Sequence, residues 1–348
     1  MKKTLIWLLG LLLIAGAVAA VGARSIWTRM HEPYKGYEGA ERYVTIPPGA
    51  GAGDIRTRLL DAGLVRDEFT LQAALRWTGA ARGLKAGEYR FDRAMSAVEV
   101  VDKLARGDIY TRRITFPEGL TIAEMARLYE MREFGRAQDF ITAAQNASLI
   151  RELDPAAPDL EGYLFPDTYA LPRDWRADRL ISVMVDRFKA TYTQDLRDKA
   201  GVQGLTTRQV VALASLVEKE TAKDEERPLV AAVYRNRMRI GMGMQADPTV
   251  VYALQKAGRY DGNIRREDLA FDSPYNTYKY GGLPPGPIAA PGRASLAAAL
   301  NPADTGYLYF VSRNDGSHVF ATTLAEHNAN VQEYQVLYFR RQREAGRQ

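Results

Sequence analysis

The sequence predicts an α+β protein that carries an N-terminal transmembrane helix. Three observations support this fold class. The N-terminus contains an uncharged run, a unit of strand, Pro-Gly turn and helix occurs twice, and the rest of the chain shows helical patterns with short strands. After the uncharged N-terminal run, roughly 320 residues remain, which is enough for about two domains. We therefore expect a transmembrane helix, a small α+β module and a larger helix-rich α+β domain.

The N-terminus predicts a membrane anchor. Leu5–Ala23 is uncharged, and its 19 residues, at about 1.5 Å each, just span a hydrocarbon core of about 30 Å. Lys2 and Lys3 favour a cytoplasmic N-terminus. A cleaved signal peptide is the alternative, because Ala17-Val18-Ala19 resembles a cleavage site, but the run exceeds a usual apolar region of about 7–15 residues. We expect residues 1–3 in the cytoplasm, an uncleaved anchor at 4–23 and the body across the membrane.

Composition excludes several kinds of chemistry. The chain has no cysteine, which rules out disulfides and thiolate catalysis. Its histidines, His31, His318 and His327, show no recognised metal-ligand spacing, so we expect no metal. We find no phosphate-binding loop, dinucleotide fingerprint or Gly-x-Ser-x-Gly elbow, and hence expect no cofactor. The net charge of +5 suits an anionic surface or polymer, but no motif points to nucleic acid. Once these kinds of chemistry are excluded, catalysis by carboxylate side chains remains.

A stalk and a small module are expected after the anchor. Residues 24–41 mix Pro33 with glycines and polar residues, which predicts little regular structure. The module, residues 42–110, begins with Val44–Gly49, whose strand and Pro-Gly turn recur as Ile114–Gly119. A second strand is expected at the end of Leu84–Phe91.

A capped helix should close this module. Ser96 and Glu99 form a capping-box pattern for the helix Ala97–Leu104, and Gly107 is expected to follow its end.

The larger domain, residues 111–340, contains three loop motifs. Glu161–Tyr169 is rich in aromatic rings, which suit a sugar groove but more commonly form core. Gln245–Val250 resembles a helix start with Asp247 as N-cap, and capping alone would explain that aspartate. Ser273–Tyr278 and Gly281–Ile288 form a long loop of a kind that is often functional. A helix from Ser295, a strand at Tyr307–Ser312 and a hairpin through Asn314-Asp315-Gly316 to His318 should follow.

The most informative stretch is Val210–Thr221, an apolar helix pattern that ends in two carboxylates. At roughly 100° per residue, Glu218 falls at the edge of the apolar face and Glu220 within it. Apolar surroundings raise the pKa of a carboxyl group, as a general acid requires. The alternative is a pair of solvated acids at a helix end, and angular position does not choose between Glu218 and Glu220.

These motifs resemble the YceG-like family, the endolytic murein transglycosylases, also called MltG. The resemblance covers nearly the whole chain, from the anchor to about Leu337, and adds His318-Val319-Phe320 and Glu326-His327-Asn328 to the motifs above. It implies cleavage of the MurNAc–GlcNAc β-1,4 bond of peptidoglycan within the strand, leaving a 1,6-anhydro-MurNAc end. The family's catalytic glutamate, the first of Val-Glu-Lys-Glu, corresponds to Glu218. Residues 42–110 resemble the family's LysM-like subdomain only loosely, so a spacer and a glycan-binding module both stay open.

The resemblance also implies a setting and a substrate groove. We expect a single-pass protein of the inner membrane with its YceG-like catalytic domain in the periplasm, acting on nascent glycan strands beside penicillin-binding protein synthases. The alternatives are a hydrolytic muramidase that pairs Glu218 with Glu161 or Glu220, and a non-catalytic peptidoglycan-binding scaffold. The residues expected to bind glycan are Glu161, Tyr163, Glu220, Gln245, Asp247, Tyr275, Asn276, Thr277 and Tyr278.

Overall fold

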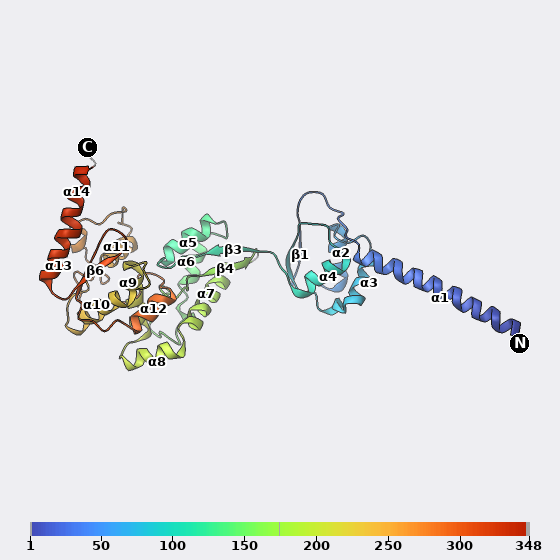
Figure 1. Ribbon diagram of the computed structural model, residues 1–348, viewed down its shortest axis with the longest axis horizontal. Helices are drawn as coiled ribbons and strands as arrows, with labels where there is room; N and C mark the ends of the chain where they lie inside the picture. The colour runs from blue at the N-terminus through green and yellow to red at the C-terminus, as the bar shows by residue number, and fades with distance from the viewer. Residues whose placement is uncertain (1, 174, 346–348) are drawn as a thin grey trace. The chain divides into compact units, whose positions relative to one another are not determined.

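The computed structural model describes residues 2–173 and 175–345 and confirms the mixed α+β class (Figure 1). The chain forms two compact units. The first runs to Arg112 and includes the segment that begins at Ala170. The second holds Arg113–Tyr169 and the chain from Trp175 onwards. The smaller unit therefore takes in a few residues that the sequence assigned to the larger domain.

The N-terminal helix α1, Lys2–His31, is long and apolar enough to cross a membrane. It also corrects the expected stalk, because helical structure continues through residues 24–31. No Gly or Pro interrupts this stretch, and the helix ends just before Pro33. Met30 is buried in the core of the first unit, so α1 enters that core without a flexible break.

The first unit encloses its core between a two-stranded sheet and helices. Strands β1 (Arg42–Ile46) and β2 (Gly87–Phe91) pair in antiparallel register. The predicted capping box is present, since Ser96 Oγ accepts from the Glu99 N–H and the Glu99 carboxylate accepts from the Ser96 N–H. Gly107 follows the capped helix in a left-handed conformation, as expected. The helices of this unit after α1 are α2 (Ala52–Asp61), α3 (Glu68–Thr78), the short η1 (Ala80–Arg82) and α4 (Ala97–Arg106).

The internal repeat is longer than its sequence signal. After α4, the chain again runs strand, two helices, one short 3₁₀ turn, strand and helix. Gly49 and Gly119 occupy equivalent turns with φ of 78° and 77°, a region that other residues adopt at a cost. The second copy consists of β3 (Thr111–Thr115), α5 (Ile122–Met131), α6 (Ala137–Ala144), η2 (Ala147–Leu149), β4 (Thr168–Pro172) and α7 (Ala177–Thr191), with β3 beside β4 in a two-stranded sheet.

The remainder of the second unit is built around α9 (Thr207–Glu220). Every residue from Val210 to Val217 is buried, because α9 packs against α8, α10, α11 and α12. The expected hairpin is confirmed, with β5 (Tyr309–Ser312) antiparallel to β6 (His318–Ala321). The other elements are α8 (Gln194–Val202), α10 (Arg227–Arg239), α11 (Asp247–Lys256), η3 (Asp268–Ala270), α12 (Arg293–Leu300), α13 (Leu324–Val331), the π-helical η4 (Gln332–Leu337) and α14 (Tyr338–Ala345).

Candidate active site

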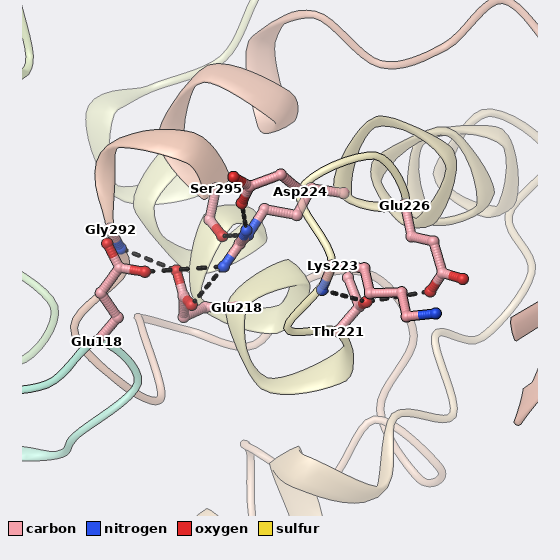
Figure 2. A network of polar contacts seen from close by, with 9 residues as sticks. Glu118, Glu218, Thr221, Lys223, Asp224, Glu226, Gly292 and Ser295 are labelled. Carbon is pink, nitrogen blue, oxygen red and sulfur yellow. Dashed lines mark hydrogen bonds and ion pairs between the residues drawn. The ribbon is translucent and has the colours of Figure 1, made fainter. Parts of the chain in front are cut away.

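The carboxylate of Glu218 lies in a polar network at the C-terminal end of the buried helix α9 (Figure 2). Its side chain is only 6% exposed. Glu218 Oε1 accepts a hydrogen bond from Arg227 Nη2 at 3.2 Å, and Oε2 accepts from the backbone N–H of Gly292 at 2.9 Å. A charged donor and a backbone N–H on the same carboxylate hold it in one orientation.

A second carboxyl group, that of Glu118, meets Glu218 from the turn that follows β3. The two carboxyl groups are close enough for the charge of Glu218 to act on Glu118. Arg227 Nη2 lies 3.7 Å from Glu118 Oε2, so one guanidinium nitrogen approaches both acids. Burial, followed by the negative charge of Glu218, raises the pKa of Glu118. Glu118 nevertheless remains 46% exposed, and it is the member of the pair that faces solvent.

Backbone contacts fix the turn that carries Glu118. Gly119 donates its N–H to the Ala290 carbonyl at 2.8 Å, and Lys219 Nζ donates to the Gly119 carbonyl at 3.1 Å. Gly292 leaves room for the acid, since a Cβ on that residue would lie 1.8 Å from Glu118 Oε1. A side chain at position 292 would therefore displace the Glu118 carboxyl group from its present place.

Arg227, at the start of α10, is the cation of the site. Its side chain is 6% exposed, and its Nε donates to Ser295 Oγ at 3.0 Å. It also pairs with the exposed Asp224. A buried guanidinium needs such partners, because an unpaired charge is costly to remove from water. Arg227 thus places one positive charge beside both acids, while burial and the charge of Glu218 favour the protonated form of Glu118.

A second group of predicted residues gathers around Glu220. Its Oε1 accepts from the Tyr234 hydroxyl at 2.6 Å, and burial raises the pKa of Glu220, with the charge of Asp247 adding to the effect. Asp247 is not the N-cap that the sequence suggested. Ala246 takes that place without a side-chain bond, and Asp247 accepts from the Tyr278 hydroxyl at 2.6 Å instead. Gln245, exposed just before them, has an unusual φ of 49°.

Glu161 and Tyr275 lie in a different place. Glu161 helps to line a cavity of about 520 Å³ with Tyr252 and Lys256. Glu161 accepts from the Ile122 N–H at 3.0 Å and from the Tyr252 hydroxyl at 3.3 Å, and burial raises its pKa to about 8. The Tyr275 ring packs on that of Tyr252, with centroids 4.8 Å apart.

Three of the residues predicted to bind glycan are enclosed in the structure. The side chain of Tyr163 is 1% exposed, that of Asn276 0% and that of Thr277 2%. Tyr163 bonds to Asp154 within the core, and Asn276 donates to the Leu269 and Phe271 carbonyls. A polymer cannot reach enclosed side chains, so in this structure these residues support the loops rather than contact a ligand.

Sequence reasoning missed Glu118, Arg227 and Gly292. Glu118 had a signal, because the internal repeat aligns Pro47-Pro48-Gly49 with Pro117-Glu118-Gly119, and the second copy places an acid where the first has a proline. Arg227 and Gly292 have no comparable signal. They reach the site through the packing of α9 against α10 and α12.

Fold and site together define a class: an α+β protein with a candidate membrane-spanning helix and a paired-carboxyl centre suited to acid–base chemistry. The model of the YceG-like family matches residues 44–333, and the chain belongs to that family.

Named relatives agree with this assignment. The chain is 32% identical over 307 residues to a protein of Bacillus subtilis named endolytic murein transglycosylase, with 84% of each chain covered. It is 31% identical to a Streptococcus pneumoniae protein of the same name, over 85% of this chain and 59% of that longer one. A crystal structure of a putative YceG-like protein from Listeria monocytogenes shares the fold, with a TM-score of 0.57 and 31% identity over 83% of this chain and 98% of that one.

Proposed function

We propose that this protein is an endolytic lytic transglycosylase that cleaves the MurNAc–GlcNAc β-1,4 bond of peptidoglycan and leaves a 1,6-anhydro-MurNAc end. One observation carries the mechanism: the carboxyl groups of Glu118 and Glu218 both lie beside Arg227 Nη2, at 3.7 and 3.2 Å. Membership of the YceG-like family, together with relatives named endolytic murein transglycosylases, supports the substrate class.

In this proposal the carboxyl pair carries one proton and cycles it. Glu218 donates the proton to the glycosidic oxygen as the bond from that oxygen to C1 breaks. The C6 hydroxyl of the same sugar attacks C1 and returns its proton to the pair, so no water is consumed. Glu118 keeps the pair protonated against the effect of Arg227, and the intramolecular attack gains from proximity.

The spacing of the two acids favours this chemistry over hydrolysis. Retaining glycosidases separate their carboxyl groups by about 5–5.5 Å and inverting ones by about 6.5–9.5 Å, which leaves room for the sugar or for water. Glu118 and Glu218 instead approach the same nitrogen, Arg227 Nη2, at 3.7 and 3.2 Å, so the two acids share one cation. The partners considered from sequence, Glu161 and Glu220, are bonded to Tyr252 and Tyr234 instead. A hydrolytic muramidase remains the second candidate, and a non-catalytic scaffold the third.

We further propose that α1 anchors the protein in the inner membrane with both units in the periplasm. Such an anchor would hold the enzyme close to nascent strands and to penicillin-binding protein synthases. Arg42–Tyr110 would serve as a LysM-like module, supported by its β1-α2-α3-β2 order with antiparallel strands. N-terminal sequencing tests the anchor, because a mature chain that starts after Ala19 or Ala23 would indicate a cleaved signal.

Mass spectrometry of digested peptidoglycan tests the reaction. The full-length protein in detergent should release fragments that end in anhydro-MurNAc, each one water molecule lighter than a reducing end. In H₂¹⁸O these ends should carry no label. Labelled reducing ends would support the muramidase, and no release from a folded protein would support the scaffold. Glu218→Gln is the control for contaminating enzymes.

A further inference from the structure

Three large aromatic side chains are exposed where α1 enters the first unit. Trp27 of α1 is 50% exposed, and Phe69 and Trp77 of α3 are 57% and 63% exposed. The ring of His31 stacks on Trp27 with centroids 4.4 Å apart and meets the edge of Trp77 at 6.3 Å. Trp27, Phe69 and Trp77 are called the aromatic patch below. Large apolar groups left exposed together mark an interaction surface.

The sequence of α1 sets the level of this patch. Trp7 and Trp27 are 20 residues apart on one unbroken helix, a distance of about 30 Å, which equals the hydrocarbon thickness of a bilayer. Tryptophan is enriched at both membrane–water interfaces. A spanning α1 therefore puts Trp27 at one interface, and His31, one turn further, stays within the headgroup layer.

Helix α3 lies across the end of α1. At its N-terminal side, Arg66 forms an ion pair with Glu32 at 3.1 Å, and at its C-terminal side Trp77 contacts His31. Both ends of this 11-residue helix thus lie beside the same turn of α1. When α1 spans a bilayer, α3 lies close to the membrane plane. Phe69 and Trp77 are eight residues apart, a spacing that places them on one side of the helix.

Charge around the patch suits anionic lipid. Arg29 and Arg76 are exposed on α1 and α3. Of the acids nearby, Glu32 pairs with Arg66 and Glu68 with Arg56. Asp67, the N-cap of α3, lies within electrostatic reach of Arg29 and Arg66. Aromatic rings next to arginines are the pattern of a segment that rests in the headgroup layer.

We propose that α3 is an interfacial helix, whose aromatic patch inserts into the headgroup layer of the membrane that α1 spans and so fixes the first unit on the bilayer surface. The inference rests on α1 as a membrane anchor, but not on the reaction. It also does not depend on whether the module binds glycan.

The absence of cysteine makes a direct test possible. Single-cysteine variants Phe69→Cys and Trp77→Cys of the full-length protein would be spin-labelled in vesicles of phosphatidylethanolamine and phosphatidylglycerol. Thr45→Cys is the matched control, since Thr45 is exposed and belongs to β1, the strand on the side of the unit away from α1 (Figure 1). Labels at 69 and 77 should collide with oxygen several-fold more often, relative to a water-soluble nickel chelate, than the label at 45. Control-like accessibility at either position would overturn the proposal.

A second measurement leaves Phe69 and Trp77 of α3 unchanged. A variant that retains Trp77 as its single tryptophan, with phenylalanine at positions 7, 27 and 175, would be reconstituted in lipids brominated near the glycerol end of the acyl chain. Bromine quenches only rings that reach the lipid, so Trp77 emission should fall relative to that in unbrominated lipid. Equal emission in the two lipids would overturn the proposal.

Discussion

Replacement of Glu118 by glutamine should shift the pH dependence of cleavage. Two unit charges about 4 Å apart repel by about 4 kcal/mol at an effective dielectric constant of about 20. Glu118 is 46% exposed, and solvent screening reduces that repulsion to about 2 kcal/mol. Since each pH unit corresponds to about 1.4 kcal/mol, the alkaline limb of the pH–rate profile should move down by about 1–2 pH units.

The direction follows from the raised pKa of Glu118, which burial and the negative charge of Glu218 both favour, because like charges placed side by side make ionisation less favourable. Without the second acid, Arg227 faces a single carboxyl group, which then loses its proton at lower pH. On the alkaline side, release of anhydro fragments should fall about 10- to 100-fold, while the rate at acidic pH changes little. Because the two acids are coupled, the pH–rate profile is fitted with macroscopic pKa values that belong to the pair and not to either residue.

Initial rates of fragment release, measured across pH, provide the assay. Glu225→Gln is the matched control, because it removes an exposed acid from the turn before α10. Circular dichroism and the melting temperature establish that each variant is folded. An alkaline limb in the same place for Glu118→Gln and the wild type would refute the shared proton, and equal loss of rate at every pH would indicate a structural role instead.

Three further predictions concern other buried groups. Glu218→Gln should lower fragment release by about 10²–10⁴-fold at every pH, because an amide cannot donate the proton, and a folded variant with substantial activity would remove Glu218 from this role. Asn276→Ala should lower the free energy of unfolding by about 2–4 kcal/mol, because its amide bonds the Leu269 and Phe271 carbonyls; an unchanged urea midpoint would contradict the supporting role. The pKa of Glu161 is raised from 4.5 to about 8, so folding favours its protonated form. This stabilisation is complete below about pH 4.5 and is lost as pH rises through about 8. The urea midpoint should therefore fall more between acidic and alkaline pH for the wild type than for Glu161→Gln, and parallel curves would count against the raised pKa.

Local signals in the sequence predicted local structure well. The capping box at Ser96 and the hairpin at Asn314-Asp315-Gly316 depend on residues a few positions apart, and both are present. The expected stalk failed for residues 24–31 because glycines and Pro33 further along the chain dominated its composition. The stretch before them contains no Gly or Pro, and burial of Met30 in the first unit stabilises the helix there.

The candidate site depended on long-range contacts that periodicity cannot show. The helical pattern left Glu218 and Glu220 equivalent, and the structure separates them by their partners, Arg227 and Tyr234. Aromatic and amide loops resembled a groove, yet Asn276 turned out to be enclosed, since hydrogen bonds to its own loop use its polar atoms. Composition alone does not distinguish a loop that binds a ligand from one that binds itself.

The two equivalent Pro-Gly turns suggest how such a site can arise. In the first copy Pro48 stands before Gly49, and in the second Glu118 stands before Gly119, with nearly the same glycine conformation. The turn therefore folds with or without a carboxylate. With an internal duplication of this kind, one copy of a turn can acquire a carboxyl group for the site while the other copy keeps a structural role.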